Sequence, residues 1–154
     1  MKSFFILLIL IFSFSCQQKK METSDVHTDS NPVKEIKKEN LQINDTLFLK
    51  YKNKNNQFTA EGSIDSIHSR IYVKFSNEYP SQLIGKIITP EEKANIRFNQ
   101  IIFPDKTSDD PFESDLKIDI KQKGFYILVI GHSQMAENPY WGKFEVQLQN
   151  ININ

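Results

Sequence analysis

The sequence predicts an all-β protein, an antiparallel β-sandwich or jelly roll of about eight short strands that follows a flexible N-terminal tether. Apolar and polar residues alternate through most of the chain after residue 43, which is the period of strands with one buried face. The composition is rich in Ile and Phe, which prefer strands, and contains only three alanines, although alanine is the best helix former. No stretch of ten residues shows a helical period.

The expected strands follow one another at short intervals, separated by turn residues such as Gly, Pro and Asn. They cover residues 46–51, 58–64, 71–75, 83–88, 95–98, 101–103, 116–120, 125–130 and 143–149. The alternation changes phase by one residue at Gln100, which predicts a β-bulge there. The segment 125–130 is apolar at every position and is therefore expected to form a central strand.

Charge and cysteine content exclude several classes of function. The 154 residues include nineteen Lys and Arg and nineteen Asp and Glu, so no excess of cations exists to bind nucleic acid through its phosphates. The single cysteine excludes an internal disulfide and any zinc site built from several cysteines.

The first fifteen residues have the layout of a secretory signal peptide. Lys2 gives a short positive start, residues 4–12 are all apolar, and this run is too short to span a bilayer. The only cysteine, Cys16, follows directly and is the predicted lipidation site. This arrangement resembles a bacterial lipoprotein signal of the Bacteroidota kind, in which cleavage leaves the cysteine first and acylated, with palmitate among the chains. The alternative is ordinary cleavage after Ser15, because residues 13–15 also form a small-x-small site.

The lipoprotein resemblance implies an address in the cell envelope. Two or more acyl chains on Cys16 would give a stable membrane anchor, whereas one chain gives marginal binding. Gln17 is not the aspartate that retains lipoproteins at the inner membrane, and no acidic run follows it. The resemblance therefore implies an outer-membrane anchor with the protein on the periplasmic face.

Residues 16–43 are expected to be the lipidated N-terminus and a flexible tether, and residues 44–154 to be the sandwich domain. The tether contains no aromatic residue and few apolar ones, so it cannot bury enough surface to offset the entropy lost on ordering. The domain contains fourteen aromatic residues, which is material for one core.

The order of motifs in the domain suggests a family. Gly62 lies on one strand, Tyr72 on the next, and a Gly124-x-Tyr126 strand precedes the final amphipathic strand at residues 144–148. This order resembles the bacterial pre-peptidase C-terminal domain and the similar β-sandwich of the inhibitors of goose-type lysozyme. The resemblance implies a sandwich that binds another molecule. The loop 132–140 has no Arg or Lys, and in this it differs from the basic loop of those inhibitors.

Two loops contain candidate binding residues. The first is rich in carboxylates, which are ligands that calcium prefers, and the alternative is an ordinary solvated loop. Its candidate metal ligands are Asp105, Asp109, Asp110 and Asp115. The second loop places Tyr140 and Trp141 together, and aromatic residues at loop tips often anchor sugars or protein partners. The alternative is that Trp141 folds back and closes one end of the sandwich.

No catalytic motif is present in the chain. His68 and His132 each follow a predicted strand, but no G-x-S-x-G, H-E-x-x-H or phosphate-binding glycine loop accompanies them. We therefore expect a non-enzymatic, lipid-anchored binding module of the cell envelope without a cofactor, apart from the calcium considered above. Its ligand would be a protein or a glycan, for example an incoming hydrolase or toxin that it inhibits. The alternative is a structural or assembly lipoprotein of an outer-membrane complex.

Overall fold

The computed structural model describes residues 39–111, 113–133 and 135–153, and in these the chain forms ten β-strands and no helix. No described segment is therefore a helix long and apolar enough to cross a membrane. The predicted signal peptide, Cys16 and most of the tether lie outside the described residues. The strands in chain order are β1 (Leu41–Ile43), β2 (Thr46–Leu49), β3 (Gln57–Ile64), β4 (Arg70–Asn77), β5 (Ser81–Ile88), β6 (Arg97–Ile102), β7 (Ser108–Asp109), β8 (Asp115–Ile120), β9 (Gly124–Gly131) and β10 (Gly142–Asn152).

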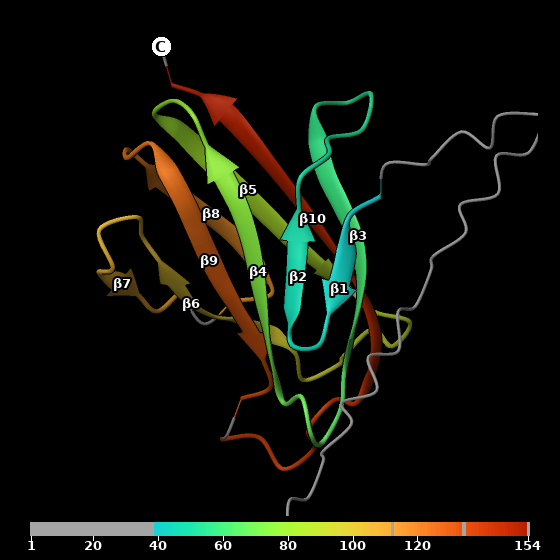
Figure 1. Ribbon diagram of the computed structural model, residues 1–154. Coiled ribbons are helices and arrows are strands. Elements are labelled where there is room, and N and C mark those ends of the chain that lie inside the picture. Colours follow the sequence, from blue (N-terminus) through green and yellow to red (C-terminus); the bar gives the residue numbers. More distant parts are fainter. Residues whose placement is uncertain (1–38, 112, 134, 154) are drawn as a thin grey trace, which may run out of the picture. The chain divides into compact units, whose positions relative to one another are not determined.

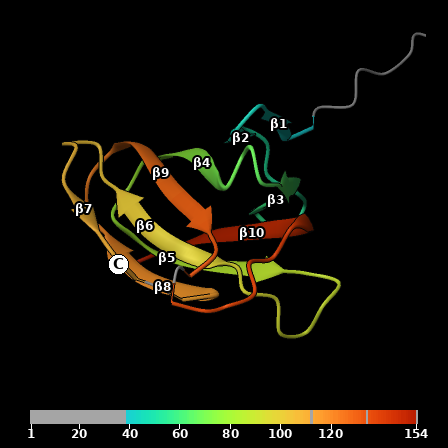
Figure 2. The same ribbon diagram turned by 90° about the horizontal axis from the view of Figure 1, so that it is seen from below.

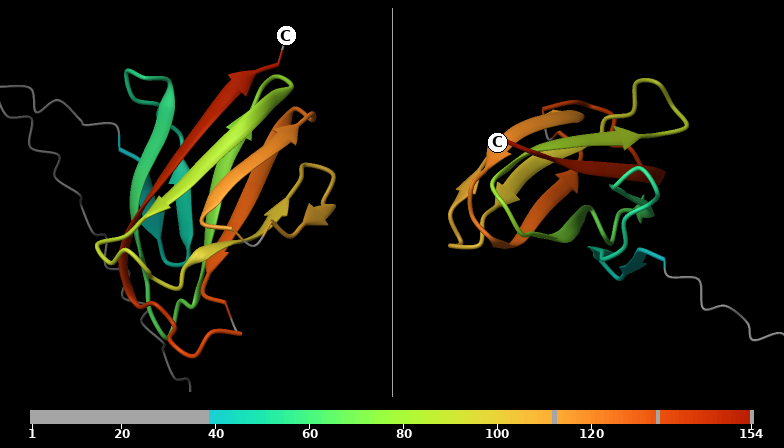
Figure 3. Two further views of the ribbon diagram at one scale, coloured as in Figure 1. Left: turned by 180° about the vertical axis from the view of Figure 1, so that it is seen from behind. Right: turned by 90° about the horizontal axis from the view of Figure 1, so that it is seen from above.

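The strands form two sheets that face each other, which confirms the predicted β-sandwich (Figures 1 and 2). One sheet has six strands in the order β1-β2-β4-β9-β6-β7, and the other has four in the order β3-β10-β5-β8. Figure 3 shows the four-stranded sheet from behind, with β10 running between β3 and β5. Consecutive strands repeatedly change sheets, so most pairings join segments that are far apart in the sequence.

One pairing departs from the predicted antiparallel arrangement. β2 and β4 are parallel, with Thr46 opposite Tyr72 and Leu49 opposite Phe75, whereas every other pair of described strands is antiparallel. The reason is that β3, which lies between them in the chain, belongs to the other sheet. The chain reverses direction once between β2 and β3 and again between β3 and β4, so β4 runs in the same direction as β2.

The core lies between the two sheets and is built by the alternation that the sequence shows. The longer strands send about every second side chain inward, as in β4, where Ile71, Val73 and Phe75 are buried. The largest fully buried side chains come from both sheets; they are Tyr126, Phe75, Phe98, Leu47, Ile64, Ile71, Leu83, Ile101, Ile120, Leu128, Ile130 and Leu148. The rings of Phe75 and Tyr126 stack with centroids 5.5 Å apart. Burial of such side chains is the main source of stability in a domain without a disulfide.

Two local predictions are confirmed. The register between β6 and β9 shifts between Phe98 and Gln100, which is the predicted bulge. β9 lies between β4 and β6 and is an interior strand, as its apolar sequence predicted. The Gly124-x-Tyr126 motif also has a structural role, because Tyr126 donates a hydrogen bond of 2.8 Å from its hydroxyl to the carbonyl of Gln122. This bond fixes the turn that leads into β9.

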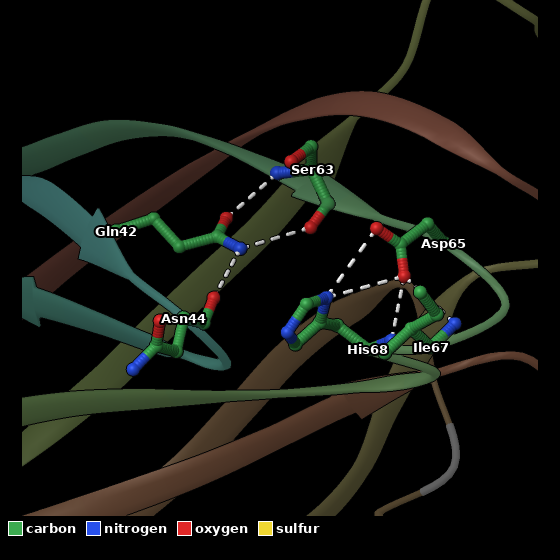
Figure 4. A network of polar contacts seen from close by, with 6 residues as sticks. All are labelled: Gln42, Asn44, Ser63, Asp65, Ile67 and His68. Atoms are coloured by element: carbon green, nitrogen blue, oxygen red, sulfur yellow. Dashed lines mark hydrogen bonds and ion pairs between the residues drawn. The ribbon is translucent and has the colours of Figure 1, made fainter.

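The sheet begins earlier than the predicted domain start at residue 44. β1 falls within the predicted tether 16–43, yet it pairs with β2 in full register. Gln42 explains the position of β1, because its side-chain amide hydrogen-bonds to the backbone of Ser63 on β3 (Figure 4). Its Oε1 accepts from the Ser63 N–H at 2.7 Å, and its Nε2 donates to the Ser63 carbonyl at 3.1 Å. The amide thus acts as a strand partner for the open edge of β3.

Candidate partner-binding face

The structure separates the two aromatic residues that the sequence placed in one binding loop. Tyr140 is buried, and its hydroxyl donates a hydrogen bond to the carbonyl of Lys143. Trp141 is 43% exposed, and its ring meets the edge of His132 with centroids 5.2 Å apart. Tyr140 therefore fills the place in the core that the alternative interpretation gave to Trp141. A binding role for Trp141 stays a prediction, and its exposure is compatible with one.

The four aspartates of the predicted calcium site do not form a donor set. Asp105 accepts hydrogen bonds from the Thr107 hydroxyl at 2.6 Å and from Gln122 Nε2 at 2.7 Å, and these bonds lower the pKa of Asp105. Asp109 lies on β7 of one sheet, whereas Asp115 begins β8 of the other. No three His, Cys, Asp or Glu side chains of the described residues could share a metal ion. Calcium binding by Asp105, Asp109, Asp110 and Asp115 stays a prediction without a site in the structure to support it.

The histidine that lies beside a carboxylate has a structural explanation. His68 Nδ1 lies 3.3 Å from both carboxylate oxygens of Asp65, in the turn between β3 and β4 (Figure 4). The same carboxylate accepts the backbone N–H of His68 at 2.5 Å and that of Ile67 at 2.8 Å. These bonds, chiefly the one from the His68 backbone, lower the pKa of Asp65. The backbone of Ser63 hydrogen-bonds to Gln42 instead, so Asp65, Ile67 and His68 form a closed turn of their own.

A groove of about 620 Å³ lies along the seam where β1 meets the edge of β3. Its lining includes the amide of Asn40, which donates to the carbonyls of Tyr51 and Thr59 at 2.8 and 3.1 Å. The amides of Asn40 and Gln42 are thus occupied by backbone partners. The polar side chains along this groove therefore have a structural role, which is to join the edges of the two sheets.

The outer face of the six-stranded sheet is more apolar than a solvated sheet face should be. The strand registers place side chains of β1, β2, β4, β9 and β6 side by side on this surface. Its apolar members are Leu41, Ile43, Phe48, Tyr72, Phe125, Ile127, Val129 and Ile102. Leu41, Ile43 and Phe125 are 57%, 59% and 63% exposed, whereas Val129 on the interior strand β9 is covered by its neighbours and 5% exposed. We call these eight residues the apolar face.

The outer face of the four-stranded sheet gives an internal comparison. Antiparallel sandwiches normally present polar side chains to water on this side. The four-stranded sheet is mostly polar on this side, with rows such as Thr59–Gln147–Lys86–Asp115 across its strands, and its outward apolar residues are Ile84, Ile88 and Ile151. Exposed single apolar residues are common on proteins, but contiguous apolar surfaces mark interaction sites. The apolar face is therefore the candidate site of this protein.

Cations are mixed with the apolar face. The ammonium of Lys74 lies 4.9 Å from the centre of the Phe125 ring, and that of Lys50 lies 5.6 Å from the Phe48 ring. Cation–π contacts of this length hold the lysine heads on the surface of the aromatic rings. The sequence interpretation missed this face, although the signal was present: β9 is apolar on both of its sides.

Comparison with known proteins shows the fold and no family. Neither a scan against protein-family models nor a search of curated proteins finds a match. Among solved structures, the chain is similar to the crystal structure of PliG from Aeromonas hydrophila, a periplasmic lysozyme inhibitor of g-type lysozyme. The TM-score is 0.50 at 12% sequence identity, and the alignment covers 68% of this chain and 95% of the other. At this identity the likeness shows that the two chains share a β-sandwich architecture.

Proposed function

We propose that the protein is a non-enzymatic binding module of the cell envelope that binds a protein partner through the apolar face. The observation that carries the proposal is the contrast between the two outer faces of one sandwich. Both outer faces would meet the same solvent in an isolated molecule. A more apolar surface on one sheet is therefore explained by a partner that covers it. Leu41 and Ile43 on the edge strand β1 and Phe125 on β9 offer exposed apolar side chains to such a partner.

The comparison supports a protein as the partner. PliG is a protein of similar architecture and is a periplasmic inhibitor of g-type lysozyme. Inhibition of a hydrolase is one form that the proposed binding would take. The architecture alone does not select it, so the test below includes g-type lysozyme as one probe among others.

We also propose that acyl chains on Cys16 anchor the protein in the envelope, at the periplasmic face of the outer membrane. Cys16 lies outside the described residues, and the support is the signal pattern before it. Intact-mass measurement of the protein purified from cells should show the mass of its acyl chains on a chain that begins at Cys16. A chain that begins there without added mass contradicts the anchor and leaves the binding proposal untouched.

The binding proposal is tested with two matched variants. Phe125→Asp introduces a charge into the apolar face, and Ile151→Asp introduces the same charge at an exposed apolar position of the other sheet. Each full-length protein is immobilised and exposed to envelope extract and, separately, to purified g-type lysozyme. We expect the wild type and Ile151→Asp to retain the same protein, and Phe125→Asp to lose it.

The identity of the retained protein separates the alternatives. Retention and inhibition of lysozyme support an inhibitor, whereas retention of an outer-membrane complex supports an assembly lipoprotein. Equal retention by all three proteins would show that the apolar face is not the site and would refute the proposal. The melting temperatures of both variants are measured first, so that only folded proteins are compared.

A further inference from the structure

The apolar face ends in a row of two arginines that flank a glycine. Arg70 on β4 and Arg97 on β6 both lie opposite Gly131 of β9, one on each side of it. Their Cα atoms are therefore two strand spacings apart, about 10 Å. Alternation along the strands places both side chains on the outer surface, because their neighbours Ile71 and Phe98 are buried.

The side chains of Asn99 and Arg70 fill the space beside Gly131. A Cβ atom at residue 131 would lie 2.9 Å from Asn99 Nδ2 and 3.8 Å from Arg70 Cγ, so the neighbouring side chains occupy the space of the missing one. Arg97 Nε is buried and has no hydrogen-bond acceptor among the described residues. Arg70 is exposed and Arg97 is half-buried, and a guanidinium at a surface is suited to a carboxylate, which accepts two parallel hydrogen bonds.

The other charges of this surface have the same sign. Lys50 and Lys74 lie on its aromatic rings, and the registers place no Asp or Glu of the described strands among its outward residues. Glu113 and Asp115 border a groove beside Arg97 at the edge of the sheet, and neither lies within ion-pair distance of it. The surface therefore combines apolar side chains with four cations.

We propose that the partner surface that covers the apolar face is an acidic protein surface, with carboxylates that pair with Arg70 and Arg97. This inference rests on the proposed function and names the chemistry of its partner. A second copy of the chain is a poor occupant, because two such faces would bring their cations together. An acidic and apolar protein surface complements both properties of the face at once.

The test selects partners from a library of random peptides displayed on phage. The full chain carrying Cys16→Ser, which cannot be acylated, is the target, and the same chain with Phe125→Asp removes peptides that bind elsewhere. We expect the selected peptides to combine Asp or Glu with apolar residues. Their affinity should fall about tenfold or more in Arg70→Glu, fall less in Arg70→Gln, and weaken as salt rises.

A matched control makes the same charge change on the opposite face. Lys117 is exposed on β8, so Lys117→Glu should leave the affinity of the selected peptides unchanged. Selected peptides without acidic enrichment, or peptides that bind Arg70→Glu as tightly as the wild type, overturn the inference while the proposed function stands. Failure to select any peptide that Phe125→Asp rejects overturns the proposed function itself.

Other occupants of the face give distinct results, and each of them overturns the inference. A membrane partner would bind the Cys16→Ser chain to vesicles of phosphatidylcholine with a quarter phosphatidylglycerol, and Arg70→Glu would release it. A second copy would appear as a dimer in sedimentation velocity that Phe125→Asp dissociates. The chain's own tether is the occupant if deletion of residues 17–38 exposes peptide binding that the longer chain lacks.

Discussion

At the residue scale, Tyr126 combines a buried ring with two polar contacts. Its hydroxyl donates to the Gln122 carbonyl at 2.8 Å and accepts the Gln122 N–H at 3.1 Å. We expect Tyr126→Phe to lower the free energy of unfolding by about 1–2 kcal/mol, because both backbone groups lose a partner in a half-buried turn. Urea unfolding measures this, with Tyr79→Phe as the control because Tyr79 is exposed. A loss of equal size in both variants would contradict this role.

The same hydroxyl makes the free energy of unfolding depend on pH in the alkaline range. Burial raises the pKa of Tyr126 above its ordinary value of 10.0. The unfolded chain therefore loses this proton at a lower pH than the folded protein does. The contribution is fully present below pH 10 and is lost as the pH rises through the raised folded value. We expect the unfolding free energy of the wild type to fall more steeply above pH 10 than that of Tyr126→Phe.

Tyr140 and Trp141 differ in burial and should differ in energetic effect. We expect Tyr140→Ala to lower the free energy of unfolding by about 3 kcal/mol or more, because the substitution leaves a cavity and removes the hydrogen-bond donor of the Lys143 carbonyl. Trp141→Ala should lower the free energy of unfolding by about 1 kcal/mol, since the Trp141 side chain is 43% exposed. Urea unfolding of the two variants checks the order. The reverse order would mean that Trp141 closes the sandwich end after all.

The sequence alone could not decide which of these two neighbours is buried. Consecutive residues of an extended chain point to opposite sides, so the choice depends on the phase in which the loop enters β10. Gly142 has φ +155° and sets that phase. This torsion is a property of the folded chain. The sequence located the loop and its aromatic pair, and the structure assigned the roles within the pair.

At the element scale, β1 is held by side-chain amides as much as by its strand partner. The Gln42 side chain hydrogen-bonds to the N–H and the carbonyl of Ser63, and it also donates to the Asn44 carbonyl at 2.8 Å. We expect Gln42→Ala to accelerate amide hydrogen exchange of Ser63, whose N–H loses its acceptor, with little change in β9. Gln149→Ala on β10 is the control. Unchanged exchange at Ser63 would show that the amide contributes nothing to the seam.

The alternation predicted the long strands and missed β1 for a physical reason. Residues 41–43 offer one period of alternation, which is too little to stand out from the polar tether before it. The strand exists because β2 and the edge of β3 are both within reach, and these are tertiary contacts. The parallel pairing of β2 with β4 was hidden in the same way, because it depends on β3 joining the other sheet.

At the scale of the whole molecule, the two outer faces show what alternation cannot reveal. Alternation with a period of two predicts which side of a strand is apolar and buried. It does not predict whether the outward sides of neighbouring strands together form a polar or an apolar surface. Leu41, Phe48 and Ile127 come from three strands whose neighbour relations the sequence does not give. Only the strand order brings them onto one surface. The metal and aromatic candidates were local motifs, whereas the apolar face is a product of topology.

The boundary of the folded unit gives the last prediction. Asn40 accepts the N–H groups of Lys50 and Tyr51 at 2.8 and 2.9 Å, so the folded unit includes residues before the predicted start at 44. We expect a chain that begins at residue 39 to melt at the same temperature as one that begins at residue 17. A chain that begins at residue 44 lacks β1 and the amides of Asn40 and Gln42. It should melt about 10 °C lower or more, since a loss of about 2 kcal/mol shifts the midpoint that far. Equal melting of the chains from 39 and 44 would show that β1 is dispensable and that the sandwich is complete without it. A lower midpoint for the chain from 39 than for the chain from 17 would instead place stabilising contacts in the tether.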